Sequence, residues 1–311
     1  MIKFSIVIPL YNKENYIEKT LQSVFNQSYS NFEVIIVNDG STDKSVNVVN
    51  QFSNKKIKII NQANQGASSA RNRGIAEASN QWIALLDADD IWLKNHLKEL
   101  EKTINLLPKA DMVGNAYEII LHKTFHKKPI YSKSLPCVPA YIDDYFSYSL
   151  IDRLFITPAI AFKKDRFESI NGFDPSIISG QDTELISRFA INFILGYNPN
   201  ITVINLKETE NNLSTTKDIY AKTVFIDKLK KYEKTKPSLK KYLDINRFAL
   251  AIQSKINRNF QLYKSLAINI DFNNLNQKQR IIIKLPSLIL IFLKKMQVIM
   301  IKLKIYKSAF N

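Results

Sequence analysis

The sequence predicts an α/β fold in which a mostly parallel sheet is flanked by helices and followed by a basic, helical C-terminal segment. Within the first 90 residues, short apolar runs alternate with segments of helical periodicity. These runs are apolar almost throughout rather than at every second residue, which is typical of strands covered on both faces. Beyond about residue 216 strand patterns stop and lysines accumulate, which predicts the basic helical segment.

The elements follow from these patterns in chain order. The β-rich run at 4–9 predicts the first strand, and Ile17, Leu21 and Val24 give residues 14–26 one apolar helical face. The same alternation predicts strands at 32–37, 56–60 and 82–86, with helices at 43–52 and 68–78. Later strands are expected at 110–121, 156–162 and 201–206, with a helix at 182–193. The Pro- and His-containing stretch 123–142 predicts a mobile loop.

The charge of the chain is unevenly distributed. Of 311 residues, the first 216 contain 23 basic and 23 acidic side chains, whereas residues 217–311 contain 21 basic and 5 acidic ones. We therefore predict a catalytic domain at 1–216 and a basic, mostly helical region at 217–311 that meets an anionic partner.

We expect that partner to be an anionic membrane surface. Lysines and apolar residues interleave near the C-terminus, and the spacing of Lys284, Lys295 and Lys302 places them on one helical face. Packing of this region on the catalytic domain, or at a dimer interface, remains the alternative.

The composition and the apolar stretches of the chain indicate its cellular compartment. With 45% hydrophobic residues the chain is globular, and its single cysteine, Cys137, allows no intrachain disulfide and suits a reducing compartment. The apolar stretch 285–293 is too short to span a bilayer, and Pro9 interrupts the N-terminal apolar run before a signal peptide could form. We expect a cytoplasmic protein, peripheral at the inner face of the cell membrane. A nucleic-acid partner is not expected, because the basic region lacks RNA-recognition motifs.

Polar clusters follow three of the predicted strands. Tyr11 comes after the first strand, Asp39 follows the second, and the run 87–90, Asp-Ala-Asp-Asp, follows the strand at 82–86. In parallel sheets ligands bind beyond the carboxyl ends of the strands, so these clusters predict one site. The DXD pair Asp87 and Asp89 can hold a hard divalent cation through carboxylate oxygens. Asp90 is interpreted as the cap of a helix at 92–106.

The ordered series of motifs resembles the inverting family 2 glycosyltransferases, which have the Rossmann-like GT-A fold. The resemblance covers residues 3–215. The motifs that carry it are VIPLYN at 7–12, VNDGSTD at 37–43, NQGASSARNRG at 64–74, LLDADD at 85–90, NGFD at 171–174 and GQDTEL at 180–185.

The resemblance implies a nucleotide-sugar site. Tyr11 would stack on a nucleobase, Asp39 would accept the imino proton of a uracil, and Arg71 would reach the diphosphate. Asp87 would meet the ribose or the metal, and Asp89 would ligate Mn²⁺ or Mg²⁺. Pro9 and Ala88 complete the predicted nucleotide-sugar site. Arg73 points to another side of its helix and is interpreted as structural.

The same resemblance makes Asp182 the general base that takes the proton of the acceptor hydroxyl. Gln181 replaces the acid that usually precedes this residue, and a simple helix N-cap is the competing interpretation of Asp182.

Many relatives carry a histidine as a third metal ligand; here Glu208 or Glu210 would substitute, or no third ligand exists. The histidines His96, His122 and His126 are expected on the surface or in loops.

The resemblance therefore implies a metal-dependent, inverting, hexosyltransferase-type enzyme. The expected donor is a nucleotide-sugar, with UDP favoured, and the acceptor a glycan or lipid-linked glycan of bacterial polysaccharide synthesis. An inactive nucleotide-sugar-binding protein of the same fold is one alternative. A nucleotidyltransferase is another, but such enzymes usually carry a Gly-rich loop after the first strand, and residues 11–14 contain no glycine.

Overall fold

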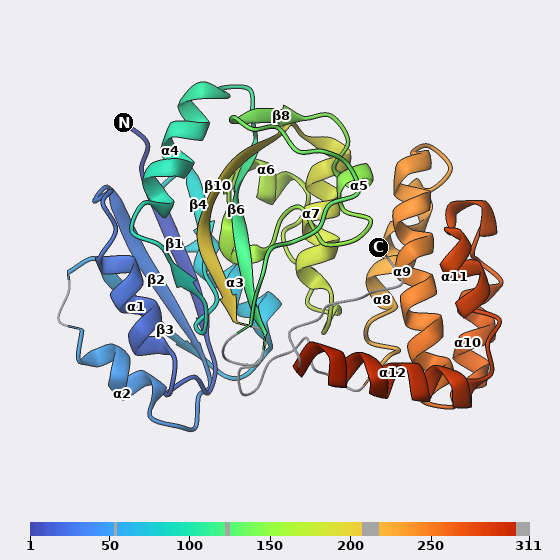
Figure 1. Ribbon diagram of the computed structural model, residues 1–311. Helices are drawn as coiled ribbons and strands as arrows, with labels where there is room; N and C mark the ends of the chain where they lie inside the picture. Colours follow the sequence, from blue (N-terminus) through green and yellow to red (C-terminus); the bar gives the residue numbers. More distant parts are fainter. Residues whose placement is uncertain (53–54, 122–124, 207–217, 303–311) are drawn as a thin grey trace.

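The computed structural model describes residues 1–52, 55–121, 125–206 and 218–302 of the chain (Figure 1). Its centre is a twisted sheet whose first half is parallel. The strand β1 (Phe4–Leu10) lies between β2 (Phe32–Asp39) and β4 (Trp82–Leu85), and β3 (Ile57–Gln62) pairs with the outer side of β2. These four strands confirm the predicted alternation.

The second half of the sheet mixes directions. The strand β9 (Ile160–Lys163) runs antiparallel between β4 and β6 (Met112–Leu121), and β10 (Leu195–Leu206) runs parallel to β6. Short strands β5 (Ile91–Trp92), β7 (Phe125–Lys127) and β8 (Ala140–Ile142) pair antiparallel with β10, β6 and β10 respectively. The prediction of a mostly parallel sheet flanked by helices is confirmed.

Two of the predicted segments between residues 123 and 162 differ from the structure. The expected strand at 156–162 begins with a 3₁₀ turn, Thr157–Ala159, in which Pro158 cannot donate to a sheet ladder. The expected loop at 123–142 contains β7 and β8, because both segments find an exposed strand edge to pair with.

Helices cover both faces of the sheet (Figure 1). Successive residues of β1 point to opposite sides, so Val7 belongs to one apolar core and Ile6 and Ile8 to the other. The helices of this part are α1 (Ile17–Phe25), α2 (Ser45–Asn50), α3 (Ala67–Ala76), α4 (His96–Leu106), α5 (Tyr145–Tyr148), α6 (Lys164–Ser169) and α7 (Gln181–Asn192).

Asp90 does not cap a helix at 92–106. The helix α4 begins at His96, four residues after the predicted start at residue 92. Trp92 lies in β5, where it pairs with Val203 of β10. The Trp92 indole donates a hydrogen bond to the Pro158 carbonyl at 2.7 Å. Tertiary pairing of a buried tryptophan therefore overrides the helical periodicity of this stretch.

The prediction for the histidines fails at His96. Its ring is fully buried, stacks on Trp92 at 4.3 Å between ring centroids and hydrogen-bonds Thr202 through Nδ1 at 2.7 Å. Burial lowers the pKa of His96 to about 3, so the ring is neutral in the folded protein. His126 lies on the exposed side of β7, as predicted, and His122 lies outside the described residues.

The described chain after residue 217 is helical, as predicted. It contains α8 (Val224–Leu229), α9 (Pro237–Ile256), α10 (Phe260–Ala267), α11 (Gln277–Ile282), α12 (Ser287–Lys302) and short 3₁₀ turns. Tyr242 of α9 packs on Tyr145 and Phe146 of α5, so this region shares a core with the sheet part. The predicted boundary between residues 216 and 217 lies outside the described residues.

The helix α12 differs from the predicted lysine face. It begins at Ser287, directly after Pro286, so Lys284 belongs to the turn that precedes the helix, and the side chain of Lys302 lies outside the described residues. Leu290 is buried, whereas Leu288 and Phe292 are 71% and 61% exposed. Over the described ranges, every helix is too short or too polar to cross a bilayer.

The neutral His96 ring makes stability depend on pH. The unfolded chain binds a proton at His96 near pH 6.5 and the folded chain does not, so stability is lost as pH falls below that value. Between pH 7 and pH 5 we expect the wild type to lose roughly 2 kcal/mol more unfolding free energy than His96→Gln. Urea unfolding at both pH values measures this difference. Parallel losses in the two proteins would show that His96 is not held neutral by the fold.

Candidate active site

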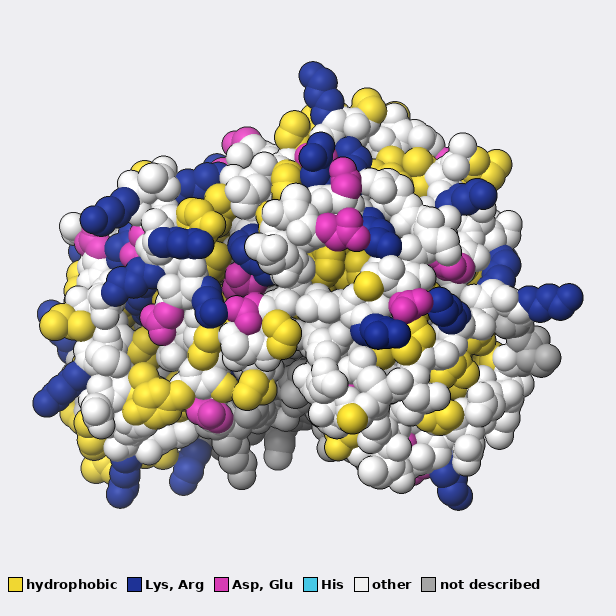
Figure 2. Space-filling view, turned by 180° about the vertical axis from the view of Figure 1, so that it is seen from behind, with side chains coloured by type: hydrophobic (Ala, Val, Ile, Leu, Met, Phe, Trp, Pro, Cys, Tyr) yellow, Lys and Arg dark blue, Asp and Glu magenta, His cyan; other side chains and the backbone are white. Residues whose placement is uncertain are grey.

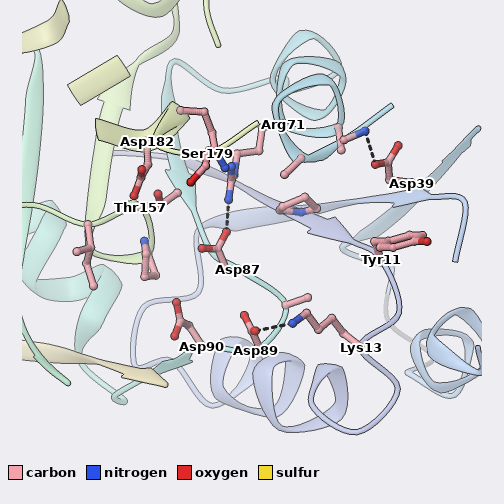
Figure 3. Close-up of a pocket in the computed structure, with 18 of the residues that line it drawn as sticks. Tyr11, Lys13, Asp39, Arg71, Asp87, Asp89, Asp90, Thr157, Ser179 and Asp182 are labelled. Carbon is pink, nitrogen blue, oxygen red and sulfur yellow. Dashed lines mark hydrogen bonds and ion pairs between the residues drawn. The ribbon is translucent and has the colours of Figure 1, made fainter. Parts of the chain in front are cut away.

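A pocket of about 520 Å³ opens at the carboxyl ends of β1, β2 and β4, between α3 and α7 (Figure 3). Residues from many separate segments of the chain line the pocket, because the parallel strands end at this edge of the sheet. All eight predicted site residues line it: Pro9, Tyr11, Asp39, Arg71, Asp87, Ala88, Asp89 and Asp182.

Tyr11 and Asp39 form one end of the pocket (Figure 3). Tyr11 follows β1 and is 41% exposed, which leaves its ring open to stacking. Asp39 is buried and accepts hydrogen bonds from Gln62 Nε2 and from the backbone N–H groups of Gln65 and Gly66, each at 2.8 Å. The carboxylate thus fixes the turn that enters α3. Three bonds leave room for about one more donor, since a carboxylate offers about four acceptor positions.

The acids after β4 each meet a basic side chain from another element. Asp87 pairs with Arg71 of α3 at 2.5 Å, and Asp89 pairs with Lys13 of the β1–α1 loop at 2.7 Å. Nε and Nη1 of Arg71 are buried and hydrogen-bond no atom of the described residues. Sequence reasoning missed Lys13, although its place in the polar run after the first strand was a usable signal.

Asp90, the last acid of the run, also lines the pocket. Burial raises the pKa of Asp90 well above its usual range, and the nearby charges of Asp87 and Asp89 raise it further. Its carboxyl group accepts hydrogen bonds from Asn205 Nδ2, at 2.9 and 3.0 Å, and from the Leu206 backbone N–H. These bonds tie the loop after β4 to the end of β10, which explains the short β5–β10 pairing.

The donor set suits a hard divalent cation. Asp87 and Asp89 present carboxylate oxygens to the pocket, and Asp90 is a third acid beside them. Within the described ranges, no group of three or more His, Cys, Asp or Glu side chains converges to form a closed cage. Mg²⁺ and similar ions are commonly held by one or two carboxylates together with substrate phosphates and water, so these residues fit. Glu208 and Glu210 lie outside the described residues.

Asp182 lies at the opposite end of the pocket from Tyr11 and Asp39 (Figure 3). It is not the N-cap of α7: the cap is Gly180, at φ 86°, where a Cβ would lie 2.8 Å from Phe225. Asp182 Oδ1 accepts the Thr183 backbone N–H at 2.7 Å, and Oδ2 pairs with Arg153 Nη1. Burial raises the pKa of Asp182, but the charge and hydrogen bond of Arg153 outweigh it and lower the pKa overall. The carboxylate is therefore ionised at neutral pH.

Arg153 was not predicted from the sequence. It lies in the loop between α5 and the 3₁₀ turn, where no motif marks it, and Tyr117 of β6 donates a hydrogen bond to its backbone carbonyl at 2.6 Å. Burial lowers the pKa of Arg153, but the opposing charge of Asp182 raises it overall, so the guanidinium stays charged.

The NGFD motif at 171–174 supports the pocket from outside. Asn72 of α3 accepts the Phe173 backbone N–H at 2.9 Å and donates to its carbonyl at 2.8 Å. This places the Phe173 ring 5.3 Å from the Arg71 guanidinium. Arg73 is exposed and pairs with Glu77, in agreement with its predicted structural role.

Comparison with known proteins decides the family. The model of the family "Glycosyl transferase family 2" matches residues 5–165, from the second residue of β1 to the end of β9 and beyond, with the acidic run inside the match. The chain belongs to glycosyl transferase family 2. The sequence-based resemblance is thereby confirmed.

Glycosyltransferases of several bacteria are similar to part of this chain. Glycosyltransferase GlyA of Streptococcus pneumoniae is 38% identical over 117 residues, or 37% of this chain and 17% of GlyA. The Escherichia coli UDP-Glc:alpha-D-GlcNAc-diphosphoundecaprenol beta-1,3-glucosyltransferase WfgD is 41% identical over 120 residues, or 37% of this chain and 46% of WfgD. The matched segments span less than half of these curated relatives.

The fold is that of a solved family 2 structure. Residues 1–349 of Staphylococcus aureus TarS, in complex with UDP-GlcNAc, superpose with a TM-score of 0.58 at 17% sequence identity. The superposition covers 89% of this chain and 78% of that one. The GT-A fold predicted from the sequence is therefore confirmed, including a helical segment after the sheet.

Proposed function

We propose that this family 2 glycosyltransferase moves a hexose from a UDP-sugar to a hydroxyl group of a glycan or lipid-linked glycan, with inversion and with Mn²⁺ or Mg²⁺ as cofactor. One observation carries the proposal: a single pocket holds Tyr11 and Asp39 at one end, the paired acids Asp87 and Asp89 in the middle, and the ionised Asp182 at the other end. That order matches the parts of a nucleotide-sugar and its acceptor.

Different pocket residues would bind the base, the diphosphate and the cation. The open ring of Tyr11 would stack on the base, and the remaining acceptor position of Asp39 would take the imino N–H of uracil. Arg71, with two donor atoms unused among the described residues, would hydrogen-bond the diphosphate. When bound at Asp87 and Asp89, the divalent cation would neutralise the charge that builds on the departing diphosphate.

Asp182 would supply the general base. The acceptor hydroxyl oxygen bonds to the anomeric carbon while the bond from that carbon to the diphosphate oxygen breaks and its electron pair leaves with UDP. The hydroxyl proton passes to the Asp182 carboxylate, which is ionised at neutral pH. Attack from the side opposite the diphosphate inverts the anomeric configuration.

The relatives support the choice of donor and acceptor. The name of WfgD records a UDP-sugar donor and a diphosphoundecaprenol-linked acceptor, and the TarS structure holds UDP-GlcNAc. A lipid-linked acceptor would be met at a bilayer surface.

We further propose that α12 brings the enzyme to an anionic membrane surface at the inner face of the cell membrane. Five exposed apolar side chains fall on one side of this helix: Leu288, Ile289, Phe292, Leu293 and Met296. Lys294 and Lys295 of the same helix are also exposed. Seen from behind, the helical region carries Lys and Arg side chains around hydrophobic patches (left in Figure 2). Apolar insertion and charge attraction to anionic lipid would add.

The substitution Asp89→Ala tests the metal site. We expect UDP binding to be at least about tenfold tighter with Mg²⁺ than with EDTA in the wild type, and this gain, ~1.4 kcal/mol, to vanish in Asp89→Ala. Titration calorimetry measures both affinities. Asp143→Ala, which removes an exposed acid that does not line the pocket, serves as the control and keeps the gain. An unchanged Mg²⁺ effect in Asp89→Ala would refute the assignment.

The substitution Asp182→Asn tests the base. An amide cannot accept the hydroxyl proton, so we expect turnover to fall by about 10²–10⁴-fold with UDP binding unchanged. Release of UDP from a panel of UDP-sugars gives the rate. Asp111→Asn also loses ion pairs, to Lys163 and Arg166, but lies away from the pocket and keeps its turnover. Near wild-type turnover of a folded Asp182→Asn would exclude Asp182 as the base.

Vesicle sedimentation tests the membrane surface. Replacing Leu288 and Phe292 together by serine removes two exposed apolar side chains, each worth up to about 1.5–3 kcal/mol when buried. We expect binding to phosphatidylglycerol vesicles to fall at least about tenfold, whereas replacing the exposed Leu106 and Val138 by serine leaves it unchanged. Equal partitioning of both double variants would assign α12 to packing or to a dimer interface instead.

A further inference from the structure

A second cavity, of about 350 Å³, lies beside the pocket that contains Asp182. Arg153, Ile156 and Thr183 line both cavities, so the second one adjoins the proposed base. Its other side is formed by α9, and Figure 1 shows this helix standing next to α5 and α8. A volume of this size lies in the range of small-ligand sites.

The lining suits a neutral ligand with many hydroxyl groups. The charged side chains at the cavity already have partners, since Arg153 pairs with Asp182 and Asp152 pairs with Lys127 at 2.7 Å. The remaining polar groups are hydroxyls and an amide: Tyr117, Ser149, Thr183, Tyr242 and Asn246. Aliphatic side chains, among them Ile119, Leu150 and Ile245, lie between them. A sugar ring offers the matching alternation of C–H faces and hydroxyls, whereas a phosphate would call for an uncommitted cation.

The helix α9 contributes to the cavity with one of its sides. Tyr242, Ile245, Asn246 and Ala249 follow one another at spacings of three, one and three residues, which places them on the same helical face. The Tyr242 ring packs 6.3 Å from Tyr145 and 5.5 Å from Phe146, so the α/β part fixes the position of α9. The C-terminal region is thereby part of the cavity lining.

We propose that this second cavity binds a sugar unit of the acceptor and that α9 therefore forms part of the acceptor site. The inference rests on the proposed function, because the adjoining Asp182 is its base. A hydroxyl of the bound sugar would reach Asp182 past Arg153 and Thr183, which border both cavities. Acceptor choice would then depend on the C-terminal region and not on the family motifs alone.

Binding of methyl glycosides to the full chain tests the proposal without turnover. Methyl glucoside, methyl galactoside and methyl N-acetylglucosaminide are titrated with UDP and Mg²⁺ present, and saturation-transfer NMR reports which of them binds. We expect at least one to bind the wild type. Ala249→Phe, which fills the cavity, abolishes this binding, and Asn246→Ala weakens it about three- to tenfold through the loss of one hydrogen bond.

The control is Ala267→Phe, the same change at a half-buried alanine of α10 outside both cavities, and it leaves glycoside binding unchanged. UDP binding, measured by calorimetry, stays the same in all variants. If no methyl glycoside binds the wild type, or if Ala249→Phe and Asn246→Ala bind like the wild type, the acceptor cavity is refuted. Absent UDP binding with intact glycoside binding would instead refute the proposed function and leave the cavity standing.

Discussion

The architecture of the pocket depends on compensating the charge of carboxylates gathered at one edge of the sheet. Asp87, Asp89 and Asp182 each meet a basic side chain at hydrogen-bond distance: Arg71, Lys13 and Arg153. Partly buried carboxylates without such partners would be costly, because their hydration is lost on folding. Asp90 is also buried; among the described residues it pairs with no cation, and it instead has a raised pKa and hydrogen bonds from Asn205 and Leu206.

These ion pairs also join elements that are distant in sequence. Lys13 connects the β1–α1 loop to the acidic run, Arg71 connects α3 to it, and Arg153 connects the loop after α5 to the start of α7. Phe173, held by Asn72, lies beside the Arg71 guanidinium. The basic side chains that pair with these acids thus lie along the site proposed for a diphosphate.

The sequence predicted what depends on local patterns. Strands such as 32–37 and the residues that follow them could be placed because apolar runs and short motifs mark them directly. His96, Trp92 and Arg153 could not, because their roles arise from contacts with β10, Pro158 and Asp182, all more than 25 residues away. Asp39 was found as a pocket residue, but its three hydrogen bonds to the 62–66 segment were not foreseeable from its turn motif.

The C-terminal helices pack on the sheet part of the protein, and they also contain the proposed membrane-binding surface. Tyr242 of α9 belongs to the same apolar core as Phe155 and Phe189, so the helical region rests on the sheet part through buried contacts. The exposed residues of α12 belong to this same helical region. Catalysis, acceptor binding and membrane contact are therefore proposed for three connected surfaces of one folded unit.

The most direct test of inverting transfer by a single base is the anomeric configuration of the product. A UDP-α-sugar that the enzyme accepts is followed by ¹H NMR at early times, before any released sugar can equilibrate. The coupling constant of the anomeric proton distinguishes the two outcomes. With Asp182 as base and attack opposite the diphosphate, we expect the first product to be β. A first product that retains the α configuration would contradict this mechanism.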